Sequence, residues 1–183
     1  PGVLIQNIGI NGAGATGGGI RFDDDGGTTY ASFGGSVVGC HFKNCVGTTA
    51  TNAATGGAVM LSGAPWQMYI GGNQFYKNVG GIVLLDTTTS APQDVTIEDN
   101  TFAGSAAAVD CDIYGAGGSG FATGLVIRGN RFAVQPAIGS GTSALYMDLT
   151  GADSGILAGN YFGTDGTLGA TGNAAKVPTT VFL

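Results

Sequence analysis

Four aspartates at the ends of short apolar segments have the chemistry needed to cleave a polysaccharide. Asp86 ends IVLLD, Asp110 and Asp112 end VDCD, and Asp148 ends ALYMD. Glycoside hydrolases use two carboxyl groups, about 5–5.5 Å apart for retention of configuration and about 6.5–9.5 Å apart for inversion. We therefore take these four residues as candidate catalytic acids, bases or nucleophiles, without dividing the roles among them.

Two other interpretations of these aspartates stay open. Several carboxylates on one face repel one another, so at least one would have a raised pKa or a cation would bind between them. Alternatively, each aspartate ends its strand and caps the following turn, as the sequences LDTTT and YMDLTG suggest. This last interpretation gives the residues a structural role and no catalytic one.

Three aromatic residues are candidates for binding carbohydrate. Trp66 lies in the segment APW, Tyr69 begins the next apolar segment, and Tyr146 lies in a later one. An exposed aromatic ring offers an apolar face that can stack on a sugar ring. The alternative for Trp66 is that it covers an end of the core or lies in a subunit contact.

The remaining reactive residues predict neither a metal site nor a cofactor. Cys40, Cys45 and Cys111 are too few for a zinc site, and buried small apolar residues or a Cys40–Cys45 bridge are the alternatives. His41 is the single histidine and has no predictable partner for a catalytic triad, so we expect it at a surface corner.

A repeat of about 30 residues positions these side chains. Each repeat has an apolar-x-apolar strand, two small or polar residues, then usually Asn-x-Phe. We expect Asn to form a corner, because it tolerates the left-handed conformation and bonds its own backbone. The aligned apolar column is Ile5, Val37, Ile70, Ile97, Ile127 and Leu157, and the aromatic column is Phe42, Phe75, Phe102, Phe132 and Phe162, preceded by Ile10.

A second strand follows in each repeat, as in GGIRFD and GIVLLD. Its period-2 alternation predicts strands and no helices. The expected inward positions are Ile20, Val59, Val83, Val109 and Leu145, which directs a column of Asp23, Ser62, Asp86, Asp112 and Asp148 outward. Two strands in each repeat of this length predict an all-β parallel solenoid of about six coils, with like residues stacked about 4.8 Å apart.

The composition of the chain limits the classes of function that it can have. The chain has 183 residues, of which 36 are glycine and 10% are charged, with a net charge of −6. This negative charge excludes a protein that binds along the phosphate backbone of a nucleic acid. No apolar run is long enough for membrane insertion. We expect one domain over 1–183, with 163–183 as a tail or cap. Outward apolar residues in columns predict a homo-oligomer.

The xIxxNxF corner followed by GGIxL resembles the right-handed parallel β-helix of the pectate-lyase-like superfamily. That superfamily includes pectate lyases, polygalacturonases and the tailspikes of bacteriophages. The resemblance covers about residues 3–162 and implies a single-stranded, right-handed β-helix. The Asn-Thr-Asp and Asp-Asp motifs of polygalacturonases are absent from this sequence.

The resemblance implies a module of a virion or extracellular appendage, similar to a tailspike or tail fibre. Its expected role is to form a rigid, trimeric shaft that binds bacterial surface polysaccharide. One alternative is a polysaccharide hydrolase or lyase that uses the outward aspartates. Another is a purely architectural virion or surface protein that neither binds nor cleaves a glycan.

Overall fold

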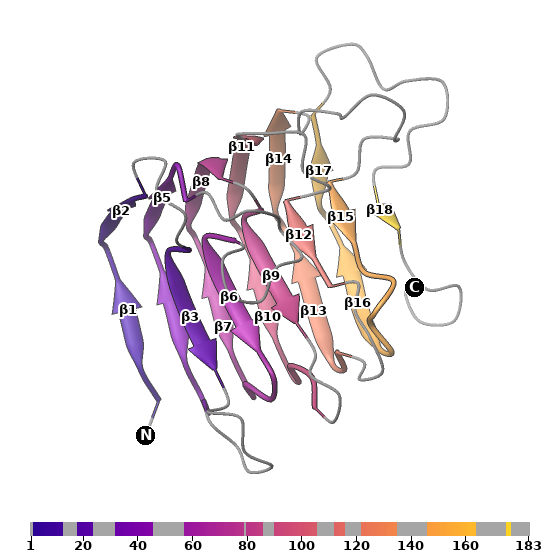
Figure 1. Cartoon of the computed structure of the whole chain (residues 1–183). Helices are drawn as coiled ribbons and strands as arrows, with labels where there is room; N and C mark the ends of the chain where they lie inside the picture. The colour runs from indigo at the N-terminus through magenta and orange to yellow at the C-terminus, as the bar shows by residue number, and fades with distance from the viewer. Residues whose placement is uncertain are drawn as a thin grey trace.

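The computed structural model is an all-β parallel solenoid made of three six-stranded sheets, with no helix in the part of the chain that it describes (Figure 1). The described residues are 2–12, 18–23, 32–45, 57–78, 80–85, 90–105, 112–115, 122–134, 146–163 and 175–176. Each strand from β1 to β15 pairs in parallel with the strand three elements later in the chain, so strands β1 and β16 lie at opposite ends of the stack.

The three sheets take one strand in turn from each repeat. Sheet A contains β1 (Leu4–Gln6), β4 (Ser36–Val38), β7 (Tyr69–Gly71), β10 (Thr96–Glu98), β13 (Leu125–Arg128) and β16 (Gly155–Ala158). Sheet B contains β2 (Gly9–Asn11), β5 (His41–Lys43), β8 (Gln74–Asn78), β11 (Thr101–Ser105), β14 (Arg131–Val134) and β17 (Tyr161–Phe162). Sheet C contains β3 (Ile20–Asp23), β6 (Val59–Ser62), β9 (Ile82–Leu85), β12 (Ile113–Tyr114), β15 (Met147–Asp148) and β18 (Ala175–Lys176).

The core columns of sheets A and B have the predicted register. Ile5 pairs with Val37, and the column continues through Ile70, Ile97, Ile127 and Leu157. In sheet B the aromatic column stacks with ring centroids 4.8–5.1 Å apart and nearly parallel planes. The strand spacing of about 4.8 Å sets this separation, so each phenyl ring packs on the next over the length of the sheet.

Each repeat has three strands where we expected two. The xIxxNxF segment bends between sheets A and B, because the residue before the Asn column adopts positive φ. Gly72, Asp99 and Gly129 have φ of 63°, 53° and 64° in three successive repeats. The short segment therefore supplies one strand to each of two sheets.

The Asn column has a different role from the one predicted. Asn73, Asn100 and Asn130 are buried, and the residues before them take the left-handed conformation in their place. The Oδ1 atom of Asn100 accepts hydrogen bonds from the backbone N and the Nδ2 of Asn73, both at 3.0 Å. The Nδ2 of Asn100 donates to the carbonyl of Ile70 and to Oδ1 of Asn130, again at 3.0 Å.

This pattern extends over the whole column, which we name the asparagine ladder: Asn73, Asn100, Asn130 and Asn160. Cys40 takes the equivalent position one strand earlier, where its backbone N donates to Oδ1 of Asn73. A similar corner lies at the ends of β5 and β8 in sheet B, where the backbone N of Cys45 donates to Oδ1 of Asn78. The ladder satisfies buried polar groups at each corner.

The predicted register of sheet C is wrong after its second strand. Ile20 pairs with Val59 as expected, but Val59 pairs with Ile82, and Ile82 is followed by Ile113 and Met147. Both sides of β6 and β9 are apolar and buried, so period-2 alternation does not identify the inward side.

The side of sheet C that faces away from the main core also differs from the prediction. Met60 and Val83 lie there in a second buried cluster with Tyr114 packed against it. Leu84, expected on that side, lies in the main core. The apolar residues of this sheet are therefore covered within the chain and do not form an exposed column.

The asparagine ladder leads to a prediction about stability. Asn100→Ala removes the acceptor of two Asn73 donors and leaves the carbonyl of Ile70 without its amide partner. We expect the free energy of unfolding in urea to fall by at least about 3 kcal/mol, because buried unpaired groups each cost about 1–3 kcal/mol.

Asn160→Ala is the matched control at the half-buried end of the ladder, where water can replace part of the lost bonding. We expect a clearly smaller loss there. Equal losses at the two positions would show that continuity of the ladder does not contribute to stability.

Candidate functional site

The structure does not bring the predicted catalytic aspartates together on an open face. Asp86 and Asp110 lie outside the described residues. The backbone N of Asp112 donates to the carbonyl of Tyr146, whereas Asp148 pairs with Tyr114. The two carboxyl groups therefore do not lie in one column. Both are buried, with 4% and 8% of their surface exposed, and the prediction that they face solvent is wrong.

Asp112 has an unusual environment for a carboxyl group. Its Oδ2 atom is buried without a hydrogen-bond partner among the described residues. Desolvation raises the pKa of Asp112 from 3.8 to about 8. The cause is burial and not the repulsion between neighbouring carboxylates that we expected. The group is neutral at pH 7 and lies out of reach of a polymer at the surface.

Asp148 caps a turn. Its Oδ1 atom accepts hydrogen bonds from the backbone N of Thr150 at 3.2 Å and from the Thr150 hydroxyl at 2.8 Å. This is the structural interpretation given to YMDLTG, and it is confirmed at this position. The catalytic assignment of the four aspartates stays a prediction, without an accessible pair in the described part of the chain.

Tyr146 does not reach the surface. It is fully buried, packs against Phe132 and Phe162, and donates a hydrogen bond from its hydroxyl to the carbonyl of Gly163. The prediction that Tyr146 faces outward is wrong, and its assignment to carbohydrate binding stays a prediction without an exposed ring to support it. The reason is that Tyr146 lies at a bend directly before β15 and not in the strand, so the alternation assumed for it does not apply.

Trp66 lies at the surface, half-buried, and is held by a carboxylate. Its indole N–H donates to Oδ2 of Asp94 at 2.6 Å. Its ring meets the edge of Phe33, which is 52% exposed, with centroids 5.9 Å apart and planes at 89°. A short parallel ladder of bridges through Phe33, Trp66, Gln93 and Thr123 positions both rings.

Tyr69 is held in a similar way on the outer side of sheet A. Its hydroxyl donates to Oε1 of Glu98 at 2.8 Å. The ring lies over Gly71, where a Cβ atom would approach the Tyr69 hydroxyl to 2.4 Å. Glycine is therefore required at 71 for this ring position, and the tyrosine is fixed along its own strand.

Glu98 connects two partners on neighbouring strands. The hydrogen bond from Tyr69 and then the bond from Arg128, whose Nε is 2.5 Å from Oε2, lower the pKa of Glu98. The same hydrogen bond to Glu98 raises the pKa of the Tyr69 hydroxyl. We name the set Phe33, Trp66, Tyr69, Asp94, Glu98 and Arg128 the aromatic–acid surface.

The other predicted residues have structural positions. His41 is exposed on sheet B, as expected, and Cys40 and Cys45 are free buried thiols and form no bridge. Within the described ranges, no three His, Cys, Asp or Glu side chains gather as they would around a metal ion. In the same ranges there is no helix of the length and hydropathy needed to cross a membrane.

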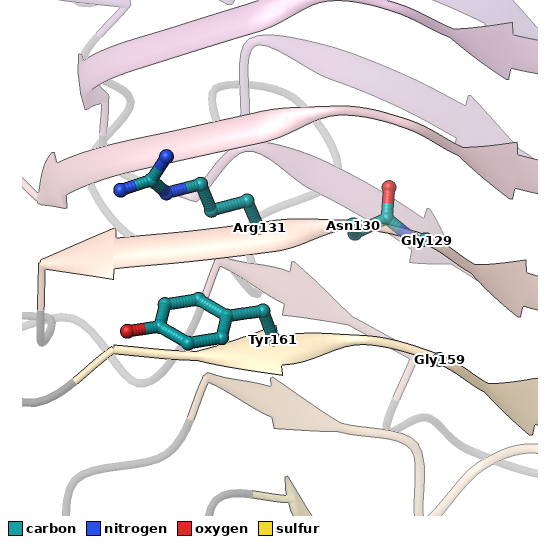
Figure 2. A pocket seen from close by; sticks show the side chains of 5 residues that line it. All are labelled: Gly129, Asn130, Arg131, Gly159 and Tyr161. Atoms are coloured by element: carbon teal, nitrogen blue, oxygen red, sulfur yellow. The ribbon is translucent and has the colours of Figure 1, made fainter.

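Sequence reasoning missed a depression between β14 and β17, shown in Figure 2. It is open, has a volume of about 300 Å³, and is lined by Gly129, Asn130, Arg131, Gly159 and Tyr161. Arg131 and Tyr161 extend side by side over it (Figure 2). The signal for Arg131 and Tyr161 is their place directly before Phe132 and Phe162. Because these phenylalanines point into the core, strand alternation directs the residue before each of them outward.

Comparison with models of protein families gives no match for this chain. Comparisons with curated proteins and with solved structures also find no match. The geometry described above is therefore the basis of the functional interpretation.

Asp112 predicts a dependence of stability on pH. The folded state keeps a proton up to about pH 8 that the unfolded state releases near pH 3.8. The stabilisation is complete below pH 3.8, and the free energy of unfolding falls as pH rises through this window, by up to about 1.4 kcal/mol per unit. Asp112→Asn should remove this slope and make the protein more stable than wild type at pH 9.

Urea unfolding at several pH values measures the slope. Asp153→Asn is the matched control at an exposed position and should keep the wild-type slope. An Asp112→Asn protein with an unchanged slope would contradict the assigned burial of the proton.

Proposed function

We propose that this chain is a parallel β-solenoid module of a virion or extracellular appendage that gives a rigid shaft and binds bacterial surface polysaccharide. The observation that carries the proposal is the aromatic–acid surface. Trp66 and Tyr69 each donate a hydrogen bond to a carboxylate of the next repeat, so their rings are held in fixed positions at the surface.

This arrangement suits sugar recognition for two reasons. An aromatic ring packs on the apolar face of a sugar, and fixing it in advance lowers the conformational entropy lost on binding. The carboxylates of Asp94 and Glu98 lie beside the rings and can accept hydrogen bonds from sugar hydroxyls. Since the residues come from neighbouring parallel strands, their spacing is set by the backbone.

The shaft role is supported by the continuity of the core. Phenylalanine rings and asparagine amides stack from strand to strand through sheet B and its corner with sheet A. The finer features that we propose are a right-handed winding, about six coils, and membership of the pectate-lyase-like superfamily with a tailspike-like role. The six strands in each sheet support the coil number.

We do not propose the enzymatic alternative. A glycosidase needs two carboxyl groups that reach the substrate. Asp112 is buried and Asp148 is bonded to its own turn, so neither has the exposure that catalysis requires.

Glycan binding is tested with Trp66→Ala. We expect the dissociation constant for the polysaccharide that binds best, from a panel of bacterial capsules and O-chains, to rise by roughly tenfold, equivalent to about 1.4 kcal/mol. Calorimetry or surface plasmon resonance provides the measurement.

Ile156→Ala is the control, because it removes an exposed apolar side chain on β16, away from Trp66. Its affinity should stay within about twofold of wild type. If the wild-type protein bound none of the polymers in its native oligomeric state, the binding function would be refuted.

The proposed appendage is a homotrimer. Val3, Leu4 and Ile8 are 56%, 59% and 43% exposed around β1, at one end of the stack, and association there would remove these side chains from water. Light scattering after size exclusion should give three times the monomer mass. A monomer at micromolar concentration would contradict the trimer and leave these residues exposed.

A further inference from the structure

The outer face of sheet B differs in charge from the rest of the molecule. The chain has a net charge of −6, yet the strands of sheet B contain no Asp or Glu. They carry half of the six lysines and arginines, namely Lys43, Lys77 and Arg131. All three are exposed, as is His41 on the same sheet.

The cations of sheet B differ from two other cations in the described part of the chain. Arg21 and Arg128, on the other two sheets, form ion pairs with Asp23 and Glu98. Within the described residues, none of the three cations of sheet B forms an ion pair with a carboxylate. Exposed charges of one sign on the same face favour an anionic ligand.

This face combines cations with an exposed tyrosine at two places, on β5 and β8 and on β14 and β17. Near one end, the Nζ atoms of Lys43 and Lys77 are 5.6 Å and 5.3 Å from the ring centroid of Tyr76, which is 44% exposed. Near the other, the Cζ of Arg131 is 5.7 Å from the ring centroid of Tyr161, which is 59% exposed. The second pair lies over the depression seen in Figure 2.

The distance between the two groups determines the kind of ligand. Tyr76 and Tyr161 are on β8 and β17, which are three strand steps apart in sheet B. At about 4.8 Å per step, this is roughly 14 Å along the stack. A single sugar does not cover this distance, whereas an extended chain of several sugars does. Exposed Gln74 and half-buried Thr101 lie between the groups and offer hydrogen bonds.

We propose that the outer face of sheet B is a second binding surface, specific for an acidic polysaccharide whose sugars carry carboxylates. This inference rests on the proposed function, because it assumes that the chain binds a glycan. Arg131 and Lys43 pair with sugar carboxylates, and Tyr76 and Tyr161 stack on sugar rings. The aromatic–acid surface on sheet A, with Asp94 and Glu98, would repel the same polymer.

A nucleic acid is the rival anionic polymer that also stacks on aromatic rings. It carries a charge on every nucleotide, and the net charge of −6 opposes such a dense polyanion over most of the surface. A uronic-acid polysaccharide with fewer charges suits three cations spread over one face.

The test compares each acidic polymer with its own neutral form. Alginate and hyaluronate are the probes, and the same polymers after chemical reduction of their carboxyl groups are the neutral partners. We expect the wild-type protein to bind the acidic forms at least tenfold more tightly. Raising NaCl from about 0.05 M to about 0.5 M should weaken this binding, because salt screens exposed charges.

The double variant Lys43→Gln/Arg131→Gln removes one cation from each group and retains both rings. We expect it to lose at least tenfold in affinity for the acidic polymers and to show a weaker salt dependence. Arg21→Gln is the matched control, since it removes the same charge from sheet C. It should bind within about twofold of wild type, and thermal unfolding should show that all three proteins are folded.

The outcomes separate this inference from the proposed function. Equal binding of acidic and reduced polymers, or unchanged affinity in the double variant, overturns the acidic specificity while leaving glycan binding in place. Tighter binding to single-stranded DNA than to either acidic polymer also overturns it. Failure to bind any polymer of this set or of the bacterial panel refutes the proposed function and the inference together.

Discussion

The corner between sheets A and B constrains the rest of this molecule. A buried primary amide must satisfy two donors and an acceptor, and in the asparagine ladder it does so with the identical amides of adjoining repeats and with a backbone carbonyl of the preceding repeat. The left-handed residue before each asparagine allows the chain to turn within two positions. Because the corner is short and its bonding is complete, strands on both sides keep a fixed register.

The two surfaces described above are consequences of this register. On sheet A it places Glu98 beside Tyr69 and Arg128, and on sheet B it places Tyr161 beside Arg131. Residues that are distant in sequence become neighbours about 4.8 Å apart, so a side chain on one strand is positioned by its equivalents on the next. Recognition by this fold therefore depends on which residue types occupy each column.

The sequence predicts the register of sheets A and B better than that of sheet C, and the corner between sheets A and B is the reason. The columns of Ile97 and Phe102 were predicted correctly, because a corner of constant length links them. Sheet C follows loops of unequal length, and Ile82 and Val83 are both apolar, so neither spacing nor alternation identified the inward residue. Asp112 and Tyr146 were misplaced for another reason, since each lies at a bend directly before its strand, where strand alternation does not apply. The partners of Trp66 and Tyr69 were also not foreseeable, since they depend on contacts between repeats.

The uniformity of the corner also bears on how such a protein can evolve. Each strand of the described chain pairs with its equivalents in the adjoining repeats, and Cys40 and Cys45 show that a ladder position tolerates a different residue where a column changes. Duplication or deletion of one whole repeat in the gene would then alter the length of the stack and leave its cross-section unchanged. Natural selection could change the length of the protein in this way and keep its fold.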